Sequence, residues 1–103
     1  MDNNNKDNFE VLRSIQKNPN SSQREMAKSL GFSLGKLNYC IRALKKKGLV
    51  KINNFKRSPN KMSYAYILTP KGIKQKTKLT LNFMIRKMKE YDELKKEYVN
   101  LKK

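Results

Sequence analysis

One stretch, Ser33–Gly48, constrains the fold more than any other part of this sequence. Ser33 is suited to cap the start of a helix, and Gly48 stands where a left-handed residue ends one. Between them, apolar residues recur at three- and four-residue steps, which predicts a helix with one buried face. These residues are Leu34, Leu37, Ile41 and Leu44, with Cys40 at the edge of the face.

The opposite face of this helix is polar and basic. A shorter helix is expected just before it, opened by the capping box Ser22–Glu25 and closed at Gly31. Two helices joined by a short turn, the second with a basic polar face, are typical of a helix-turn-helix. The sequence therefore predicts a DNA-binding module. The polar face consists of Gly35, Asn38, Tyr39, Arg42 and Lys46.

This polar face carries side chains that can read DNA. Arginine can bond guanine bidentately, and asparagine can do the same with adenine. A glycine at position 35 lets the start of the helix approach a phosphate closely. The alternative is an ordinary solvated face, but asparagine and tyrosine in place of Glu/Lys pairs favour DNA contact. The candidates in or along the major groove are Lys36, Asn38, Tyr39, Arg42 and Lys46.

The start of the chain predicts one more helix. Residues 1–7 are expected to be disordered, and Asp7 is expected to cap a helix with Glu10 at its third position. Asn18-Pro19 ends this helix, because the residue before a proline avoids the helical region. Its apolar face comprises Phe9, Leu12 and Ile15, with Val11 beside it.

After Gly48 the hydrophobic period changes. Leu49–Ile52 and Tyr64–Leu68 are short runs with partial alternation, which predicts a β-hairpin. The connection Asn53–Ser63 is expected to be a long basic loop, or wing, that reaches phosphates or the adjacent minor groove. The fold class is then mainly α with a small β-hairpin. The wing candidates are Lys56, Arg57 and Lys61.

The last element is a single long helix. Thr69 caps it, Pro70 suits its first position, and it runs for roughly 45–50 Å at about 1.5 Å per residue. Phe83 and Ile85 are expected to pack on the body of the domain. The remaining apolar residues form an irregular coiled-coil seam, which we interpret as a homodimer interface rather than a ligand pocket. The seam begins near Thr77 and contains Leu81, Met84, Met88, Tyr91, Leu94, Tyr98 and Leu101.

Composition narrows the function classes. A net charge of +17 in 103 residues favours polyanionic partners, of which double-stranded DNA fits the motifs. With no histidine, and with Cys40 facing the core without a base, neither an enzyme nor a metal or cofactor site is expected. The chain has no apolar run of membrane-spanning length, and its polar start lacks a signal sequence, so we expect a cytoplasmic protein.

These motifs occur in a familiar order. SSQREMAKSLGFSLGKLNYCIRALKKKGLV, the wing and ILTPKG resemble MarR-type winged helix-turn-helix regulators of bacteria, and most closely a subgroup associated with exopolysaccharide genes. The resemblance extends over Asn8–Gly72. It implies a dimer whose third helix reads the major groove while the wing touches backbone or minor groove. The positions it implies are Ser33, Lys36, Asn38, Tyr39 and Arg42, with Lys56, Arg57 and Lys61 in the wing.

The chain also departs from typical MarR proteins. It lacks their long N-terminal dimerisation helix, so dimerisation is expected to fall on residues 70–103, after a DNA-binding domain over residues 8–69. We expect a transcription regulator that binds an inverted repeat, with recognition helices about 34 Å apart. The main alternative is a protein-interaction module that recruits a partner through the last helix. RNA binding is a weaker one, because Tyr64 and Tyr66 do not form an RNP-like platform.

Overall fold

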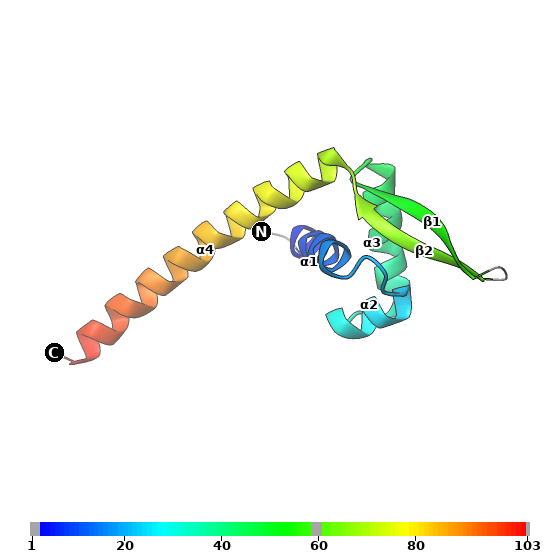
Figure 1. Cartoon of the computed structure of the whole chain (residues 1–103). Coiled ribbons are helices and arrows are strands. Elements are labelled where there is room, and N and C mark those ends of the chain that lie inside the picture. Colours follow the sequence, from blue (N-terminus) through cyan, green and yellow to red (C-terminus); the bar gives the residue numbers. More distant parts are fainter. Residues whose placement is uncertain (1–2, 59–60, 103) are drawn as a thin grey trace.

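The structure, a computed structural model, describes the backbone of residues 3–58 and 61–102 and the side chains of residues 5–52 and 65–102. Four helices and one antiparallel hairpin follow one another along the chain, as the sequence predicted (Figure 1). The elements are α1 (Asn3–Lys17), α2 (Gln23–Leu30), α3 (Leu34–Lys46), β1 (Val50–Ser58), β2 (Lys61–Leu68) and α4 (Pro70–Lys102).

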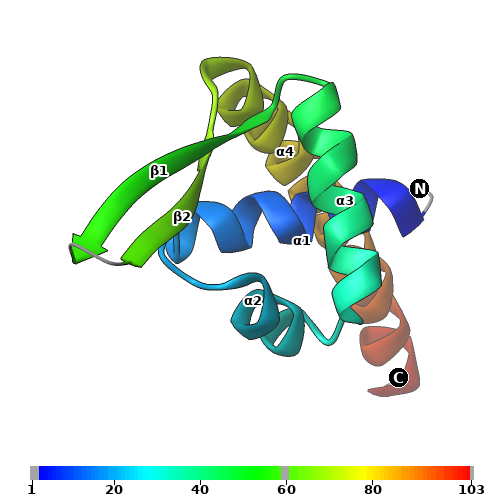
Figure 2. The ribbon, with the colours of Figure 1, turned by 90° about the vertical axis from the view of Figure 1, so that its right-hand side faces the viewer.

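The molecule has a compact body and one long projection. Helix α1 contacts α2, α3, β2 and α4, so it is the central element of the body. Helix α4 begins beside the hairpin, crosses α1 and continues away as a rod, while the hairpin projects on the other side (Figures 1 and 2). This arrangement gives the molecule principal extents of 69 × 26 × 21 Å.

The core of the body lies between α1, α2 and α3. Burial of each large apolar side chain contributes about 1.5–3 kcal/mol, which allows so small a core to hold the three helices together. Helix α1 is buried along the face that the sequence predicted, including Phe9. The side chains with almost no exposed surface are Val11, Leu12, Ile15, Met26, Leu37, Ile41 and Leu44.

The predicted caps set the ends of the short helices. The Ser22 hydroxyl accepts a hydrogen bond from the Glu25 amide at 3.1 Å, so α2 starts where the capping box indicated. Gly31 ends α2 with φ +71°, and Gly48 follows α3 with φ +75°. Both glycines occupy the left-handed region that side chains disfavour, which fixes the two turns around α3.

The start of α4 is tied to the turn after α3. The Thr69 hydroxyl caps α4 by accepting from the Gly72 amide at 3.0 Å, and it donates to the Gly48 carbonyl at 2.6 Å. The Thr69 amide donates to the Leu49 carbonyl at 3.0 Å. Gly72 lies against the backbone of Leu49 so closely that a Cβ atom would overlap it. These contacts fix the direction in which α4 leaves the body.

The beginning of the chain differs from the prediction. Helix α1 starts at Asn3, so residues 3–7 are helical rather than disordered, and Asp7 lies inside the helix instead of capping it. The reason is tertiary contact that the local sequence does not reveal. Asp7 pairs with Lys36 of α3, and the same end of α1 lies beside α4, where Asn5 and Asn8 line a hollow together with Gln75.

The hairpin is longer than predicted. The pairing of β1 with β2 continues from Val50 opposite Leu68 to Lys56 opposite Met62, with an irregularity before Ser58. The expected long loop over residues 53–63 is therefore wrong. Each further residue pair extends the backbone hydrogen-bond ladder, so the strands persist beyond the short apolar runs that signalled them.

Two details of the predicted packing also change. Leu34 was assigned to the buried face of α3 but is 45% exposed, while Cys40 is buried. Phe32, in the turn before α3, packs against the core at the end of the helix where Leu34 lies. Phe83 packs on the body as expected, whereas Ile85 is exposed.

Candidate nucleic-acid interface

The outer face of α3 is exposed to solvent and polar. Its buried residues follow the i, i+3, i+4, i+7 pattern, so the residues between them must point to solvent. Tyr39 is 74% exposed despite its aromatic ring. The residues that line one open hollow on this face are Gly35, Asn38, Tyr39, Arg42, Ala43 and Lys46.

Within the described residues, Arg42 and Lys46 on this face have no anionic partner. The ion pairs found in the described part of the chain are Asp7–Lys36 and Lys87–Glu90. Neither involves Arg42 or Lys46, both of which are exposed. An unpaired guanidinium or ammonium on an exposed helix face can bind a base edge or a phosphate without first breaking an internal contact.

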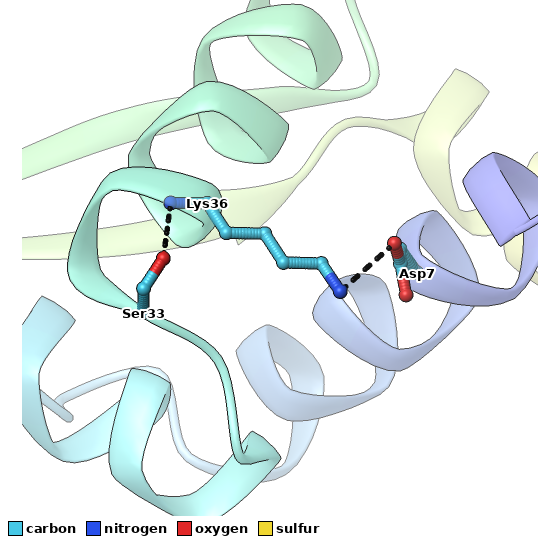
Figure 3. A network of polar contacts seen from close by, with 3 residues as sticks. All are labelled: Asp7, Ser33 and Lys36. Atoms are coloured by element: carbon cyan, nitrogen blue, oxygen red, sulfur yellow. Dashed lines mark hydrogen bonds and ion pairs between the residues drawn. The ribbon is translucent and has the colours of Figure 1, made fainter.

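Lys36 differs from the other predicted contacts. Its ammonium lies 3.3 Å from the Asp7 carboxylate and 4.2 Å from the centre of the Phe32 ring. Figure 3 shows the side chain reaching from α3 to α1, away from its own helix. The structure therefore separates Lys36 from the hollow formed by Asn38, Tyr39 and Arg42.

Ser33 lies at the exposed start of α3. Its hydroxyl accepts a hydrogen bond from the Lys36 amide at 3.1 Å, which confirms the predicted N-cap (Figure 3). A serine hydroxyl that accepts one hydrogen bond can still donate its own hydrogen, for example to a phosphate oxygen. The capping contact thus holds Ser33 at the helix end where an anion is favoured.

Reasoning from the sequence missed two residues of this region. Ala43 lines the hollow beside Tyr39, and it could have been found because it follows Tyr39 by four residues on the helix. Asp7 was assigned to a helix cap, and no local signal connects it with Lys36, which lies far away in the sequence.

The hairpin is held against α2. The Gln23 side chain donates to the Tyr66 hydroxyl at 2.6 Å, and Tyr66 is buried. Lys56 and Arg57 belong to β1 and Lys61 to β2, at the far end of the hairpin. Their side chains lie outside the described residues, so the wing contacts stay a prediction.

Chemical sites are sparse in the described residues. Burial raises the pKa of the Cys40 thiol, the charge of Asp7 raises it further, and Lys36 opposes them. The neutral thiol is therefore favoured, which makes Cys40 a poor nucleophile. Within the described ranges, no three metal-binding side chains gather into a cluster, and none of the helices combines the length and apolarity that a bilayer requires.

The predicted seam of α4 lies beyond the body. Its seven apolar side chains are between 54% exposed at Met84 and 86% exposed at Leu101. Nothing in the part of the chain that the structure describes covers them, and their assignment to dimerisation stays a prediction. The seven are Leu81, Met84, Met88, Tyr91, Leu94, Tyr98 and Leu101.

Comparison with known proteins supports the fold. Residues 8–51 match the family described as winged helix-turn-helix DNA-binding. None of the curated proteins matches the chain. Among solved structures, the transcriptional repressor CouR bound to a 23-mer DNA duplex is similar over 84% of this chain and 59% of its own, with 29% identity and a TM-score of 0.67.

Two further structures show the same likeness. Mutant MarR from E. coli complexed with operator DNA covers 70% of this chain at 27% identity and a TM-score of 0.58, and 50% of its own length is covered. A MepR mutant from S. aureus bound to an oligodeoxyribonucleotide covers 98% of this chain and 75% of its own, at 18% identity and a TM-score of 0.66.

The chain thus spans 59% of the length of CouR and half the length of MarR. These three structures do not bear on the exopolysaccharide subgroup. Residues 8–51 therefore match the winged helix-turn-helix DNA-binding family, and the fold of the chain is similar to the folds of CouR and MarR.

Proposed function

We propose that this protein is a sequence-specific, DNA-binding transcription regulator that acts as a homodimer on an inverted repeat. The observation that carries the proposal is the outer face of α3, where Asn38, Tyr39 and Arg42 are exposed together around one hollow. Helices of this kind fit the major groove, in which each base pair presents its own pattern of donors and acceptors.

Each residue of this face has a distinct role in the proposal. Arg42 bonds a guanine through two N–H groups, and Asn38 bonds an adenine. Tyr39 contacts a base or sugar beside them, while Lys46 and Ser33 bond phosphates and fix the register. The open surface at Gly35 allows the helix to lie deep in the groove, because no side chain or neighbour stands there.

The wing and Lys36 add contacts outside the major groove. The hairpin carries Lys56, Arg57 and Lys61 toward the backbone or the minor groove next to the recognised bases. Lys36 can reach a phosphate only after it leaves Asp7, so its contribution is smaller than that of Arg42. In this proposal α3 recognises the base sequence, whereas the wing and Lys36 contribute affinity that does not depend on sequence.

Related proteins support DNA as the partner. CouR and MarR are both more than a quarter identical to this chain, and they are solved with a DNA duplex and with operator DNA, respectively. The net charge of +17 favours the same partner, because each bound lysine or arginine releases counterions from DNA. As a DNA-binding regulator the protein acts in the bacterial cytoplasm. The resemblance of its sequence to the exopolysaccharide-associated subgroup suggests that it controls exopolysaccharide genes.

The proposal is tested by selection of random DNA duplexes on the purified protein at about 150 mM salt, with the mass of the complex measured in parallel. We expect an enriched inverted repeat bound by a dimer, with affinity that falls steeply as salt rises. Uniform weak binding that vanishes with salt would reject sequence-specific recognition.

Substitutions then separate reading from affinity. Arg42→Ala should lower the ratio of specific to nonspecific affinity by about 5- to 100-fold, since one bidentate contact discriminates by about 1–3 kcal/mol. Lys61→Ala should weaken all sequences alike. Lys96→Ala, on the far part of α4, is the matched control and should leave both unchanged. An unaltered ratio in Arg42→Ala would show that α3 is not the reader.

One observation favours a second function. The exposed apolar face of α4 also fits a different protein, which would make the chain an interaction module that recruits a partner. That function predicts a monomer in isolation, whereas the regulator predicts a dimer. The mass measurement distinguishes the two.

A further inference from the structure

Among the described residues, none covers the apolar face of the far part of α4. Leu79 is the last buried residue of the helix, and Phe83, stacked on Phe9 at 4.7 Å between ring centres, is the last to contact the core. From there α4 continues to Lys102 as a rod that leaves the body (Figure 1). Nine of its large apolar side chains over residues 81–101 are at least 46% exposed.

The spacing of the exposed seam is symmetric about Tyr91. On either side of Tyr91, going outward, the seam residues follow at steps of three, four and three. Each seam residue thus has a counterpart at the same distance on the other side. The counterparts are Leu81 with Leu101, Met84 with Tyr98, and Met88 with Leu94.

We propose that α4 pairs with α4 of a second copy in antiparallel orientation, with the twofold axis beside Tyr91. In an antiparallel pair, residues at equal distances from the axis lie opposite each other. The symmetric spacing therefore places every seam residue opposite another seam residue, and Tyr91 opposite itself. This inference rests on the homodimer of the proposed function and gives it a specific geometry.

The charges of α4 distinguish the two possible orientations. Every charged residue of α4 before Glu90 is basic, whereas its four carboxylates all lie within Glu90–Glu97. Antiparallel pairing places residues 90–97 opposite residues 85–92 of the second copy, which contain the three cations Arg86, Lys87 and Lys89 as well as the carboxylates Glu90 and Asp92 next to the axis. Parallel pairing would place acidic segment against acidic segment and basic against basic, which opposes association.

Residues on the flanks of the seam fit the same orientation. Ile85 and Val99 are both 46% exposed and lie on one flank of the helix. The antiparallel pair brings Ile85 of one copy next to Val99 of the other. On the opposite flank it brings Lys87 of one copy next to Glu97 of the other. One flank of the pair is therefore closed by an apolar contact and the other by an ion pair.

The body offers a place for the end of the second helix. A hollow between α1 and α4 has Phe9, Phe83 and Met84 in its lining. Its charged lining residues are the cations Lys6, Arg13, Lys76, Arg86 and Lys87 and the carboxylates Glu10 and Glu90, so cations predominate. In the antiparallel pair the end of the second α4 lies at the level of Leu81. Its Leu101 then reaches the apolar part of this hollow, and its Glu97 reaches the cations.

This geometry sets the distance between the DNA-binding units. At about 1.5 Å per residue, the two Pro70 residues lie about 60 Å apart along the rod. That exceeds the roughly 34 Å between successive major grooves on one face of DNA. We therefore expect half-sites about two helical turns apart, in place of the single turn that the general docking geometry of helix-turn-helix dimers predicts. The two basic bodies are then separated by far more than the Debye length of about 8 Å.

Cysteine cross-linking tests the orientation directly. Met84→Cys and Tyr98→Cys are made separately in the full chain and treated with a short bismaleimide, alone and after mixing. We expect cross-linked dimers only in the mixture, because Met84 lies opposite Tyr98. Tyr91→Cys should cross-link with itself, and Lys96→Cys, on the outer face, should not. The parent chain is the control for Cys40, which is buried.

A distance measurement gives a second, independent readout. A nitroxide at Lys74→Cys, on the exposed start of α4, should give a spin–spin distance of about 50 Å for the antiparallel pair. A parallel pair would give less than about 20 Å, because paired helices lie about 8–10 Å apart.

The outcomes separate this inference from the proposed function. Cross-linking of Met84→Cys with itself, or the short distance, would overturn the antiparallel pair but leave a homodimer intact. A monomeric mass would overturn both the pair and the homodimer. Sequence-specific DNA binding is measured separately by the duplex selection, so it can stand or fall independently of either result.

Discussion

Helices α3 and α4 carry the same kind of sequence pattern with opposite outcomes. In α3, the residues Leu37, Ile41 and Leu44 are almost completely buried, because α1 and α2 lie against them. In the far part of α4, residues such as Tyr91 and Leu94 recur at similar steps and are more than 60% exposed. A helical hydrophobic period thus predicts which face needs a cover without specifying what covers it.

The difference divides the chain into two parts. The body completes its core within one chain, so the exposed face of α3 is held in place. The far part of α4 has no such cover among the described residues. In the proposed function the body therefore supplies recognition, and α4 sets the number and spacing of the recognition surfaces.

The largest effect is expected from truncating the buried helix face. Leu37→Ala should lower the free energy of unfolding by about 2–5 kcal/mol, because Leu37 has no exposed surface and its removal leaves a cavity. Thermal or urea denaturation followed by circular dichroism measures this loss.

Leu94→Ala is the matched substitution on the exposed face. It should change the stability of the body by less than about 0.5 kcal/mol, as is usual for surface sites. In the proposed dimer, however, two leucines leave the interface, so the dissociation constant should rise about tenfold or more. Equal effects of Leu37→Ala and Leu94→Ala on body stability would contradict the division into two parts.

The junction between the two parts should be the next most sensitive site. Gly72→Ala adds a methyl group where the Leu49 carbonyl already lies, so the start of α4 must shift. Overpacking of this kind costs about 1–3 kcal/mol. Gly35→Ala, also within a helix but with open space around the new methyl group, is the control and should not destabilise the body. Unchanged unfolding of Gly72→Ala would show that the junction is loose.

Most of the fold could be predicted because its signals are local. The caps Ser22, Ser33 and Thr69 and the turn glycines Gly31 and Gly48 mark helix ends wherever they occur, and the structure confirms them. The misplaced elements depend on distant contacts. The early start of α1 and the long hairpin rest on tertiary and cross-strand interactions that no short window contains.

In the candidate site too, the local pattern predicted which residues share a face, and distant contacts could not be predicted. Helical periodicity alone brings Asn38, Tyr39 and Arg42 onto one face, as the structure shows. The pattern also assigned Lys36 to the DNA surface, which stays a prediction, and it could not reveal that the ammonium group of Lys36 lies beside Asp7 and Phe32 in the free chain. The position of a flexible side chain depends on partners that only the folded chain supplies.

Two ion pairs allow a finer comparison of the body with α4. Asp7–Lys36 joins two helices at 3.3 Å, whereas Lys87–Glu90 spans one turn of α4 at 3.4 Å. Asp7→Asn should lower the free energy of unfolding by less than about 1 kcal/mol, because Lys36 is half exposed. Glu90→Gln should lower the free energy of unfolding by no more than a few tenths of a kcal/mol.

Asp7→Asn should also affect DNA binding, unlike Glu90→Gln. It releases Lys36 toward the phosphates and removes one negative charge beside α3. The salt dependence of binding should then steepen by up to about one counterion per copy. Titrations at several salt concentrations measure this slope. A steeper slope in Glu90→Gln as well would mean that the change reflects net charge and not the release of Lys36.

The smallest expected effect concerns the flank of the proposed α4 pair. Lys87→Glu places a negative charge next to Glu97 of the second copy. The dissociation constant of the dimer should rise a few-fold, since exposed ion pairs contribute about 0.2–1 kcal/mol each. Adding Glu97→Lys reverses both charges of the contact and should restore the affinity, as measured by sedimentation equilibrium. In a parallel pair the two substituted positions do not meet, so the double variant would stay as weak as the single one or become weaker. Recovery in the double variant therefore depends on the antiparallel register itself, which makes this small effect the most specific test of how the two copies meet.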